Sequence, residues 1–423
     1  MKKARTIVLS TRHCALLLSF VILLTASQSQ SAGFGIFTQG ADALGRANAT
    51  VAQSDGASAA YFNPALLPSL SGTRLEIGTT AVVPVRKFKS DLDGSIERNE
   101  DTVYFPSTFY LTHQFNDRWS AGLAVFNPFG LGTIWDSGWE GNVLATKSRI
   151  TTFNINPVVA FQVTPRLALG AGLDIVLLDA KLKSRVGSED FPILSAIDQS
   201  FTGDGEGLGY NVGLHLQLTD ALSFGAAYRS EIRIDIDGRA SFRVPDFLQE
   251  DFGFLFGNTR GKTSLTLPAQ LTAALAYQLS PEWVVEAGIR WEEWSSFRRL
   301  KIDLAQPVAG SDTTLAPRNW KNTWAFNVGT KYHLNERLAL MAGYLYGENP
   351  VPDSTFEPAI PDSDTHLFTV GGALSFDRFS LDLAYGFQLQ ENRRKTTNEY
   401  GDIANGRYKN QIHLVAASLG YAF

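Results

Sequence analysis

From Arg74 to the end of the chain, apolar residues alternate with small or polar residues over long segments. In residues 208–218, for example, every second position is apolar, and the positions between are glycine, asparagine, histidine or glutamine. A period of two is typical of a β-strand with one apolar and one polar face. The segments are longer than the usual five or six residues of soluble strands, and they match the roughly 9 to 11 residues with which a tilted strand crosses a membrane.

This alternation predicts about fourteen strands, an even number as in bacterial outer-membrane barrels. They lie at 74–83, 104–114, 119–127, 150–162, 166–178, 208–218, 222–236, 263–279, 282–294, 320–334, 337–347, 366–376, 379–389 and 411–423. We therefore predict an all-β fold, a transmembrane antiparallel β-barrel.

The connections between the predicted strands alternate strictly between short and long. Short turns fall at 116–118, 164–165, 219–220, 280–281, 335–336 and 377–378. Long links fall at 84–103, 128–149, 179–207, 237–262, 295–319, 348–365 and 390–410. In bacterial barrels short turns face the periplasm and long loops face outward, so both termini are expected in the periplasm.

The first 31 residues have the pattern of a secretory signal peptide. Four basic residues precede an apolar run at 15–24, and small residues then precede a cleavage point that we place before Ala32. The run has about half of the roughly 20 residues that a membrane-spanning helix needs, so a retained helix is the weaker alternative. Cys14 is the one cysteine of the sequence, so the mature chain would contain none and need no disulfide.

The net charge of the protein indicates which kinds of partner it can bind. The whole sequence carries a formal charge of −5, and removal of four basic residues with the signal peptide would leave −9. An acidic protein of this kind is not expected to bind nucleic acid. No linker rich in proline, serine or charge divides the strand region, so residues 71–423 are expected to form one barrel domain.

Residues 32–70 are dominated by glycine and alanine and lack the large apolar residues that an independent helix or strand would bury. The segment ends in a rigid turn at Tyr61–Ala65, where Pro64 fixes its own φ and keeps Asn63 out of the helical region. Composition alone also allows a disordered linker. However, about eight strands is the limit for a barrel filled by its own side chains. We therefore predict that 32–70 is a hatch that plugs the lumen.

Aromatic residues fall where this topology puts the two bilayer interfaces. Trp119 and Trp283 follow short turns, and the residues expected near the opposite rim are Trp291, Trp294, Trp320 and Trp324. The C-terminal strand ends in Phe423, like the signal that the outer-membrane barrel assembly machinery reads. A soluble β-sandwich would also alternate, but it predicts neither the loop rhythm nor this C-terminus.

Several short motifs follow one another along the mature chain. They are Gly45–Ala47 (GRA), Tyr61–Ala65 (YFNPA), Asn127–Leu131 (NPFGL), Asn154–Pro157 (NINP), Trp291–Ser295 (WEEWS), Pro350–Asp353 (PVPD) and Pro361–His366 (PDSDTH). Together they resemble the FadL family of outer-membrane long-chain fatty acid transporters, which also includes importers of aromatic hydrocarbons. The resemblance covers the whole mature chain. It implies a hatch whose characteristic turn is Asn63, Pro64 and Ala65.

The resemblance also implies an inward kink of the third strand that opens a lateral gap in the wall. Asn127, Pro128, Phe129 and Gly130 lie at the upper end of the predicted third strand. Pro128 cannot donate a hydrogen bond to the ladder, and Gly130 lets the backbone bend. The alternative is that the Asn-Pro pair only begins the outer loop, and the sequence leaves both possibilities open.

Two predicted outer loops are more apolar than a hydrated surface requires. Their candidate ligand-binding residues are Phe191, Ile193, Leu194, Ile197 and Phe201 in one loop and Phe247, Leu248, Phe252, Phe254 and Phe256 in the other. Exposed apolar patches commonly bind something. The family resemblance implies that these loops form a first docking groove for a hydrophobic ligand. The alternative is that they pack on each other as a lid.

The function expected from these observations is passive uptake of a hydrophobic molecule, with long-chain fatty acids as the first candidate and alkanes or aromatic hydrocarbons as the second. The molecule would leave lipopolysaccharide or solution, dock at the loops, and exit sideways beside the third strand. A carboxylate ligand would need a cation, and the candidates are Lys181, Lys183 and Arg185. Solvated rim charges are the alternative explanation for these three residues.

Rival classes are an outer-membrane lipase, an open porin and a structural barrel. The histidines at 113, 215, 333, 366 and 413 lie in no nucleophile-elbow or metal-spacing motif, so a non-enzyme is expected. No metal or nucleotide motif is found in the sequence, and no cofactor is expected. The expected partners are hydrophobic small molecules, outer-membrane lipid and lipopolysaccharide, and the assembly machinery, with the protein itself a monomer.

Overall fold

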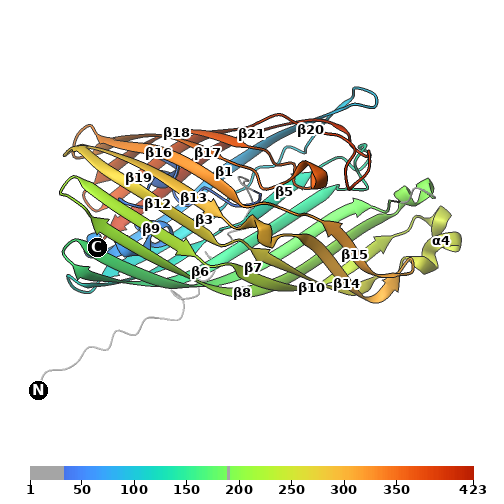
Figure 1. The fold of residues 1–423 in the computed structure, drawn as a ribbon, viewed down its shortest axis with the longest axis horizontal. Helices are drawn as coiled ribbons and strands as arrows, with labels where there is room; N and C mark the ends of the chain where they lie inside the picture. The colour runs from blue at the N-terminus through green and yellow to red at the C-terminus, as the bar shows by residue number, and fades with distance from the viewer. Residues whose placement is uncertain (1–32, 188–190) are drawn as a thin grey trace, which may run out of the picture.

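The computed structural model describes residues 33–187 and 191–423. The predicted signal peptide and Ala32 lie outside the described residues. Within the described chain, fourteen antiparallel strands, six of them interrupted, close into one barrel (Figure 1). The first strand closes on the last through a continuous ladder from Arg74↔Ala422 to Ser90↔Gly406. The predicted fold class is therefore confirmed.

The uninterrupted barrel strands are β1 (Thr73–Ser90), β3 (Ser107–Gln114), β6 (Lys147–Thr164), β7 (Leu167–Arg185), β8 (Asp198–Gln217), β17 (Leu338–Gly347), β18 (Thr365–Phe376) and β21 (Gly406–Ala422). The interrupted ones are β4 (Trp119–Phe126) with β5 (Gly130–Ile134), β9 (Leu222–Arg229) with β10 (Ile232–Arg243), β11 (Thr259–Leu267) with β12 (Gln270–Ser280), β13 (Trp283–Glu292) with β14 (Arg299–Val308), β15 (Ser311–Pro317) with β16 (Thr323–His333), and β19 (Phe379–Gln390) with β20 (Arg393–Lys395). A short strand, β2 (Ile96–Arg98), pairs with the end of β1.

The helical segments are all short. They are α2 (Ala41–Gly45), α3 (Ala59–Phe62), η1 (Pro64–Ser69), η2 (Pro192–Ala196), α4 (Asp246–Phe252), η3 (Gly253–Leu255), η4 (Trp294–Ser296) and η5 (Asp353–Thr355). Among the described residues, no helix has the length and apolar character needed to cross a membrane.

The six predicted short turns lie at one end of the barrel, together with the C-terminus (Figure 1). We call this the turn end and the opposite end, which carries α4, the loop end. Two predicted long links are wrong: β8 already begins at Asp198, and residues 299–317 form the β14–β15 hairpin rather than a loop. The strands continue there with polar, charged and small residues on the outward face, so the apolar alternation that predicts strands elsewhere is lost.

The barrel exposes its apolar face. In β8 the side chains of Leu208, Tyr210 and Val212 are 76%, 51% and 43% exposed, whereas Asn211 between them is buried. This arrangement is the inverse of a soluble protein, and it suits a wall surrounded by lipid. Trp119, Trp283 and Trp324 are exposed on this face, but Trp294 and Trp320 are buried inside the barrel, so their predicted place at the outer rim is wrong.

The segment from residue 33 to residue 70 lies inside the barrel, and almost all of it is buried. We call it the plug. Small residues on the lumen face let it approach the wall: a Cβ at Gly170 or Gly213 would collide with Pro64 or Asn63. The predicted N-terminal hatch inside the lumen is confirmed.

Candidate functional site

The wall strand formed by β4 and β5 is interrupted at Asn127–Phe129. Both strands pair with β6, from Phe126↔Asn154 on one side of the break and from Gly130↔Thr151 on the other. The outer connection therefore begins only after Ile134, and the interruption lies within the wall. All four residues proposed for a kink, Asn127, Pro128, Phe129 and Gly130, are buried.

The start of the plug is hydrogen-bonded to this interruption. The Ile36 N–H donates to the Pro128 carbonyl at 2.9 Å, and the Gly130 N–H donates to the Phe34 carbonyl at 2.7 Å. Gly35 and Phe129 thus form an isolated antiparallel bridge. The broken strand therefore finds inside the barrel the partners that it lacks in the wall.

Asn127 holds the interruption in place through its side chain. Its Oδ1 accepts a hydrogen bond from the Ser107 N–H at 3.0 Å, and its Nδ2 donates to the Thr152 carbonyl at 2.6 Å. The side chain thus connects β3 to β6 where the β4 backbone leaves the ladder. An asparagine suits this position because it offers one acceptor and two donors.

Above the interruption, Phe34 of the plug is fully buried among aromatic rings. Its ring centroid lies 4.8 Å from Trp294, 5.8 Å from Trp320 and 5.9 Å from Phe129, mostly edge to face. Gly33 precedes it with φ +72°, and a Cβ there would collide with Trp320. The tip of the plug therefore needs a glycine in order to place Phe34 in this cluster.

A second contact fixes the tip of the plug to an outer connection. The Gly33 N–H donates to Asp362 Oδ2 at 2.7 Å, and Gln390 Nε2 donates to Asp362 Oδ1 at 2.8 Å. Burial raises the pKa of Asp362 to about 7, and the Gly33 hydrogen bond works against that rise. Asp362 belongs to the PDSDTH motif, but the motif alone did not indicate this role.

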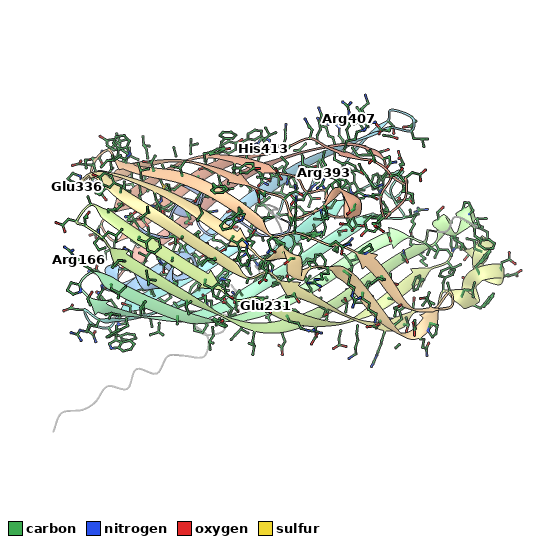
Figure 2. All side chains as sticks on the ribbon, viewed as in Figure 1. Arg166, Glu231, Glu336, Arg393, Arg407 and His413 are labelled. Carbon is green, nitrogen blue, oxygen red and sulfur yellow. The ribbon has the colours of Figure 1, made fainter. Side chains whose placement is uncertain are left out.

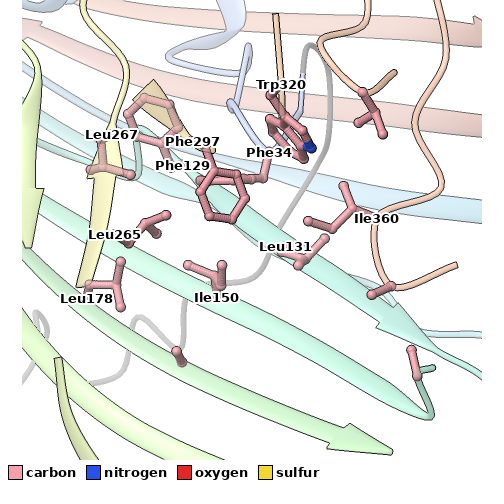
Figure 3. Packing of buried hydrophobic residues seen from close by; sticks show 14 of the residues in the cluster. Phe34, Phe129, Leu131, Ile150, Leu178, Leu265, Leu267, Phe297, Trp320 and Ile360 are labelled. Atoms are coloured by element: carbon pink, nitrogen blue, oxygen red, sulfur yellow. The ribbon is translucent and has the colours of Figure 1, made fainter. Parts of the chain in front are cut away.

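An apolar pocket of about 60 Å³ lies beside Phe34, and we call it the inner pocket. Figure 3 shows the side chains of Leu131, Ile150 and Leu265 converging on Phe34 and Phe297 from different wall strands. The remaining lining residues are Ser148, Ala180, Leu182, Phe201, Ile236, Thr263, Leu300, Arg318, Ala359 and Ile360. Such a lining favours a hydrophobic ligand.

A larger cavity of about 280 Å³, the outer cavity, lies toward the loop end. It shares with the inner pocket the residues Ser148, Leu182, Phe201, Leu300, Arg318 and Ala359. Its other walls come from the loop-end parts of the strands, including Phe242 of β10, and from connections that contain Val143 and Tyr400. The two spaces are therefore neighbours along one path from the loop end to Phe34.

The two apolar segments predicted as docking loops pack on each other at the loop end. Leu194, Ile197, Leu248 and Phe256 are buried in one cluster, and Phe252 packs against it. The Phe191 and Phe252 rings lie 6.2 Å apart. Four apolar side chains remain more than half exposed: Phe191, Ile193, Phe247 and Phe254. The segments thus combine a packed lid with an exposed apolar surface.

Phe201 does not belong to an outer loop. It lies in β8, is 5% exposed, and lines both the inner pocket and the outer cavity. The sequence pattern predicts a loop at this position, because the glycines and acidic residues at 203–207 interrupt the apolar alternation that indicates a strand.

The three candidate cations for a carboxylate share one face of β7. Lys181, Lys183 and Arg185 alternate with Ala180 and Leu182, which line the inner pocket. Their side chains therefore point to the outward face of the wall. Arg185 donates to the Ser195 carbonyl at 3.0 Å, within the outer connection. None of the three lines the inner pocket, although Lys183 is among the residues that border the outer cavity.

The turn at Asn63, Pro64 and Ala65 lies deeper, against the wall at β7 and β8. Asn63 Nδ2 donates to the Val51 carbonyl at 2.8 Å and to the Leu214 carbonyl of β8 at 2.9 Å, and Asn63 Oδ1 caps Ala65 N–H at 3.1 Å. One side chain thus connects two parts of the plug to the barrel.

Sequence reasoning missed the polar residues that line the path. Arg318, 6% exposed, forms an ion pair with Glu357, with 2.6 Å between Arg318 Nη2 and Glu357 Oε1. It also donates to the Tyr400 hydroxyl. Arg318 lies in the interruption between β15 and β16, whereas Glu357 and Tyr400 belong to two connections distant in sequence, so no local motif signals the contact. Among the described residues, no group of three or more His, Cys, Asp or Glu side chains is placed to hold a metal ion.

Comparisons with known proteins agree with this architecture. Residues 22–423 match a family model described as outer membrane protein transport protein (OMPP1/FadL/TodX). The chain is 23% identical to the long-chain fatty acid transport protein of an Escherichia coli strain, over 96% of this chain and 98% of the relative. It is 24% identical to outer membrane protein P1 of Haemophilus influenzae, again over 96% and 98% of the two chains.

Solved structures show the same fold. A Pseudomonas aeruginosa FadL homologue superimposes with a TM-score of 0.82 at 23% identity, covering 93% of this chain and all of that one (100%). The Pseudomonas putida toluene transporter TodX superimposes with a TM-score of 0.73 at 22% identity, covering 91% and 98%.

Proposed function

The chain belongs to the OMPP1/FadL/TodX family of outer membrane transport proteins, and from that premise we propose that it admits hydrophobic small molecules passively across a bacterial outer membrane. Two of the matched proteins are named as transporters, of long-chain fatty acids and of toluene. In this proposal the loop end faces outward, both termini are periplasmic, and the protein acts as a monomer after insertion by the barrel assembly machinery.

One observation carries the proposal. An apolar path leads from the loop end to Phe34. Phe34 lies beside the break between β4 and β5, which is the only wall interruption in the described chain that is hydrogen-bonded to the plug tip. The exposed apolar side chains at 191, 193, 247 and 254 would capture a molecule from lipopolysaccharide or solution. The molecule would then pass through the outer cavity into the inner pocket. Each buried methylene contributes about 0.8 kcal/mol, so a long chain binds without polar help.

The proposed exit is sideways, between β3 and β5. In the described residues β5 has a backbone ladder with β6 alone, and the β3–β4 ladder ends at Phe109↔Val125. The plug closes the bore below, so a hydrophobic molecule has no straight route. Release would require Phe34 and Gly35 to leave the interruption, since they close the pocket on that side.

Long-chain fatty acids are the first candidate cargo, because the family includes relatives named for them. Hydrocarbons are the second, and the Arg318–Glu357 pair favours them. The inner pocket has one charged lining residue among those described, Arg318, and a buried Glu357 already neutralises it. A carboxylate would have to displace Glu357 and leave that carboxylate buried without a partner, which is costly.

Two matched probes distinguish these cargoes: oleate and oleyl alcohol, which differ only in the head group. If the pocket selects uncharged cargo, the alcohol enters intact cells expressing the protein at least tenfold faster than oleate. Glu357→Gln should then raise oleate uptake, because Arg318 is no longer neutralised, and the double variant R318Q/E357Q should not. Equal uptake of both probes by the unmodified protein would favour fatty acids.

The lateral route is tested by a reversible block. Gly35 and Phe129 form a bridge of the non-hydrogen-bonded kind, because the flanking hydrogen bonds run from Ile36 and Gly130. Their Cα atoms should lie about 4.5 Å apart, within disulfide reach. The variant G35C/F129C, oxidised in an otherwise cysteine-free mature chain, should lose uptake and regain it with reductant. Each single-cysteine variant is the matched control.

Uptake that continues at the unmodified rate in the oxidised variant would overturn the proposed exit. No uptake of any hydrophobic probe by the unmodified protein, or a large ion-conducting pore in a planar bilayer, would overturn the function itself. Hydrolysis of a lipid ester by the pure protein would instead support the lipase alternative.

A further inference from the structure

Basic side chains gather on the outward face of the barrel where β2, β1, β21 and β20 lie side by side at the loop end. The ladders put Lys87 opposite both Arg98 and Lys409. In the next row they put Arg407 opposite both Lys89 and Arg394. Residues directly opposite in an antiparallel pair share a face. We call this group the cation patch: Lys87, Lys89, Arg98, Arg394, Arg407 and Lys409.

The patch points away from the lumen. The residues that alternate with its members along β1 and β21, Arg86, Phe88, Tyr408 and Asn410, are buried inside the barrel. Five of the six patch residues are exposed, and Lys87 is half-buried. Figure 2 shows Arg407 on the outer side of the barrel, nearer the loop end than His413.

The same strands place the patch directly above an apolar and an aromatic layer. Val415 and Leu419, lower on the outward face of β21, are 55% and 47% exposed. Between them and the patch, the Tyr385 hydroxyl lies 2.8 Å from His413 Nδ1. An apolar band bounded by aromatic residues marks the hydrocarbon layer and its interface. The patch therefore lies at the level of the lipid head groups.

The positive charges of the patch are compensated at only one described position. Like charges directly opposite on neighbouring strands repel and destabilise the sheet, and four such pairs occur here. Among the described residues, one acid forms an ion pair with the patch, Asp91 Oδ2 at 3.0 Å from Arg394 Nη2. Anions from outside the chain would remove this repulsion.

We propose that the cation patch binds the phosphate groups of lipopolysaccharide in the outer leaflet. The inference uses the outward orientation of the loop end from the proposed function, and it is independent of the transport route. Arginine and lysine are the usual partners of phosphate, and arginine can bind it bidentately. The patch crosses four strands spaced about 4.8 Å apart, so it can contact more than one phosphate of a large phosphorylated glycolipid.

The experiment compares lipid retention by the purified mature protein in detergent. The patch variant is K87A/K89A/R407A/K409A. Its matched control, R118A/R166A/R337A/R378A, removes four exposed cations at the turn end. A third variant, K87R/K89R/R407K/K409R, keeps the charge. Native mass spectrometry and titration then measure binding of lipopolysaccharide, of lipopolysaccharide with its phosphates removed, and of phosphatidylglycerol vesicles.

We expect the patch variant to bind lipopolysaccharide at least tenfold more weakly than the unmodified protein, with the control and the charge-keeping variant within twofold. Removal of the phosphates should weaken binding to the unmodified protein by a similar factor, and higher salt should weaken it further. Thermal unfolding checks that each variant is folded. Undiminished binding by the patch variant, or equal retention of phosphatidylglycerol, would overturn the assignment. Loss of binding with uptake intact separates this inference from the transport function.

Discussion

The two halves of the lumen share one wall but are lined by different chemistry. Toward the turn end, most inward positions are charged, polar or small. The plug occupies this half, and a cavity of about 320 Å³ remains beside it, lined by charged side chains such as Asp42, Lys331 and Asp382. Toward the loop end, the inward positions around the inner pocket are mostly aliphatic or aromatic, and Arg318 is the one charged residue among those described that lines it. A polar lining is satisfied by charged partners or by water, whereas an apolar lining favours an apolar ligand.

The charged half is held by contacts between wall and plug. Lys331 Nζ of β16 lies 2.8 Å from Asp42 Oδ1 and 2.7 Å from Asp55 Oδ2. Glu286 of β13 accepts from three consecutive plug N–H groups, at 2.6 Å from Val51, 3.1 Å from Ala52 and 2.9 Å from Gln53. The plug core is thus anchored while its tip touches the apolar half.

The largest expected effect is on the charged half. Lys331→Met leaves the buried Asp42 without one of its cationic partners, and breaking a buried pair costs about 3–5 kcal/mol. The free energy of local opening of the plug, measured by hydrogen exchange at residues 41–56, should fall accordingly. Lys301→Met, at a pair whose side chains are 45% and 56% exposed, should have little effect. Unchanged exchange in the Lys331 variant would show that the ion pairs do not anchor the plug.

The next effect is on the apolar half. Phe34→Ala removes the ring that packs 4.8 Å from Trp294, and such a truncation costs about 3 kcal/mol or more. Hydrogen exchange should become faster at the plug tip but not at residues 41–56. Uptake of oleyl alcohol should increase because the Phe34 ring no longer blocks the inner pocket. Phe34→Leu should lie between the variant and the unmodified protein. Slower uptake with normal folding would mean that Phe34 guides the cargo rather than blocking it.

Sequence reasoning succeeded where one physical pattern dominates. The strands were predictable because outward residues such as Leu208 and Val212 must be apolar in lipid. The β14–β15 hairpin was not, because it lies beyond the apolar band. The sequence pattern predicts the wrong place for Trp294 and Trp320, because tryptophan is common both at membrane interfaces and in buried cores. The Arg318–Glu357 contact joins a strand interruption to a loop that only the closed barrel brings near it.

A smaller effect is expected at Asn63, the side chain that connects the plug to the barrel wall. Asn63→Ala removes hydrogen bonds to the Val51 and Leu214 carbonyls and leaves buried acceptors unpaired, at a cost of about 1–3 kcal/mol. Exchange at residues 51–65 should rise while thermal unfolding of the barrel barely changes. Asn63→Asp should cost more, since it keeps the acceptor for Ala65 but replaces the donor with a charge. A milder Asp variant would show that the donor is not the important group.

The smallest effect is expected for the cations on the outward face of β7. Lys183 and Arg185 lie on the outward face of β7, and the Arg185–Asp198 contact, 3.8 Å long, joins side chains that are 27% and 58% exposed. Such contacts contribute about 0–1 kcal/mol. The variant K183A/R185A should therefore change uptake of both oleyl alcohol and oleate by less than twofold. A tenfold loss for oleate alone would give these cations a role in carboxylate capture. It would also mean that the protein selects ligands by charge at its outer surface, before they reach the polar and apolar halves of the lumen.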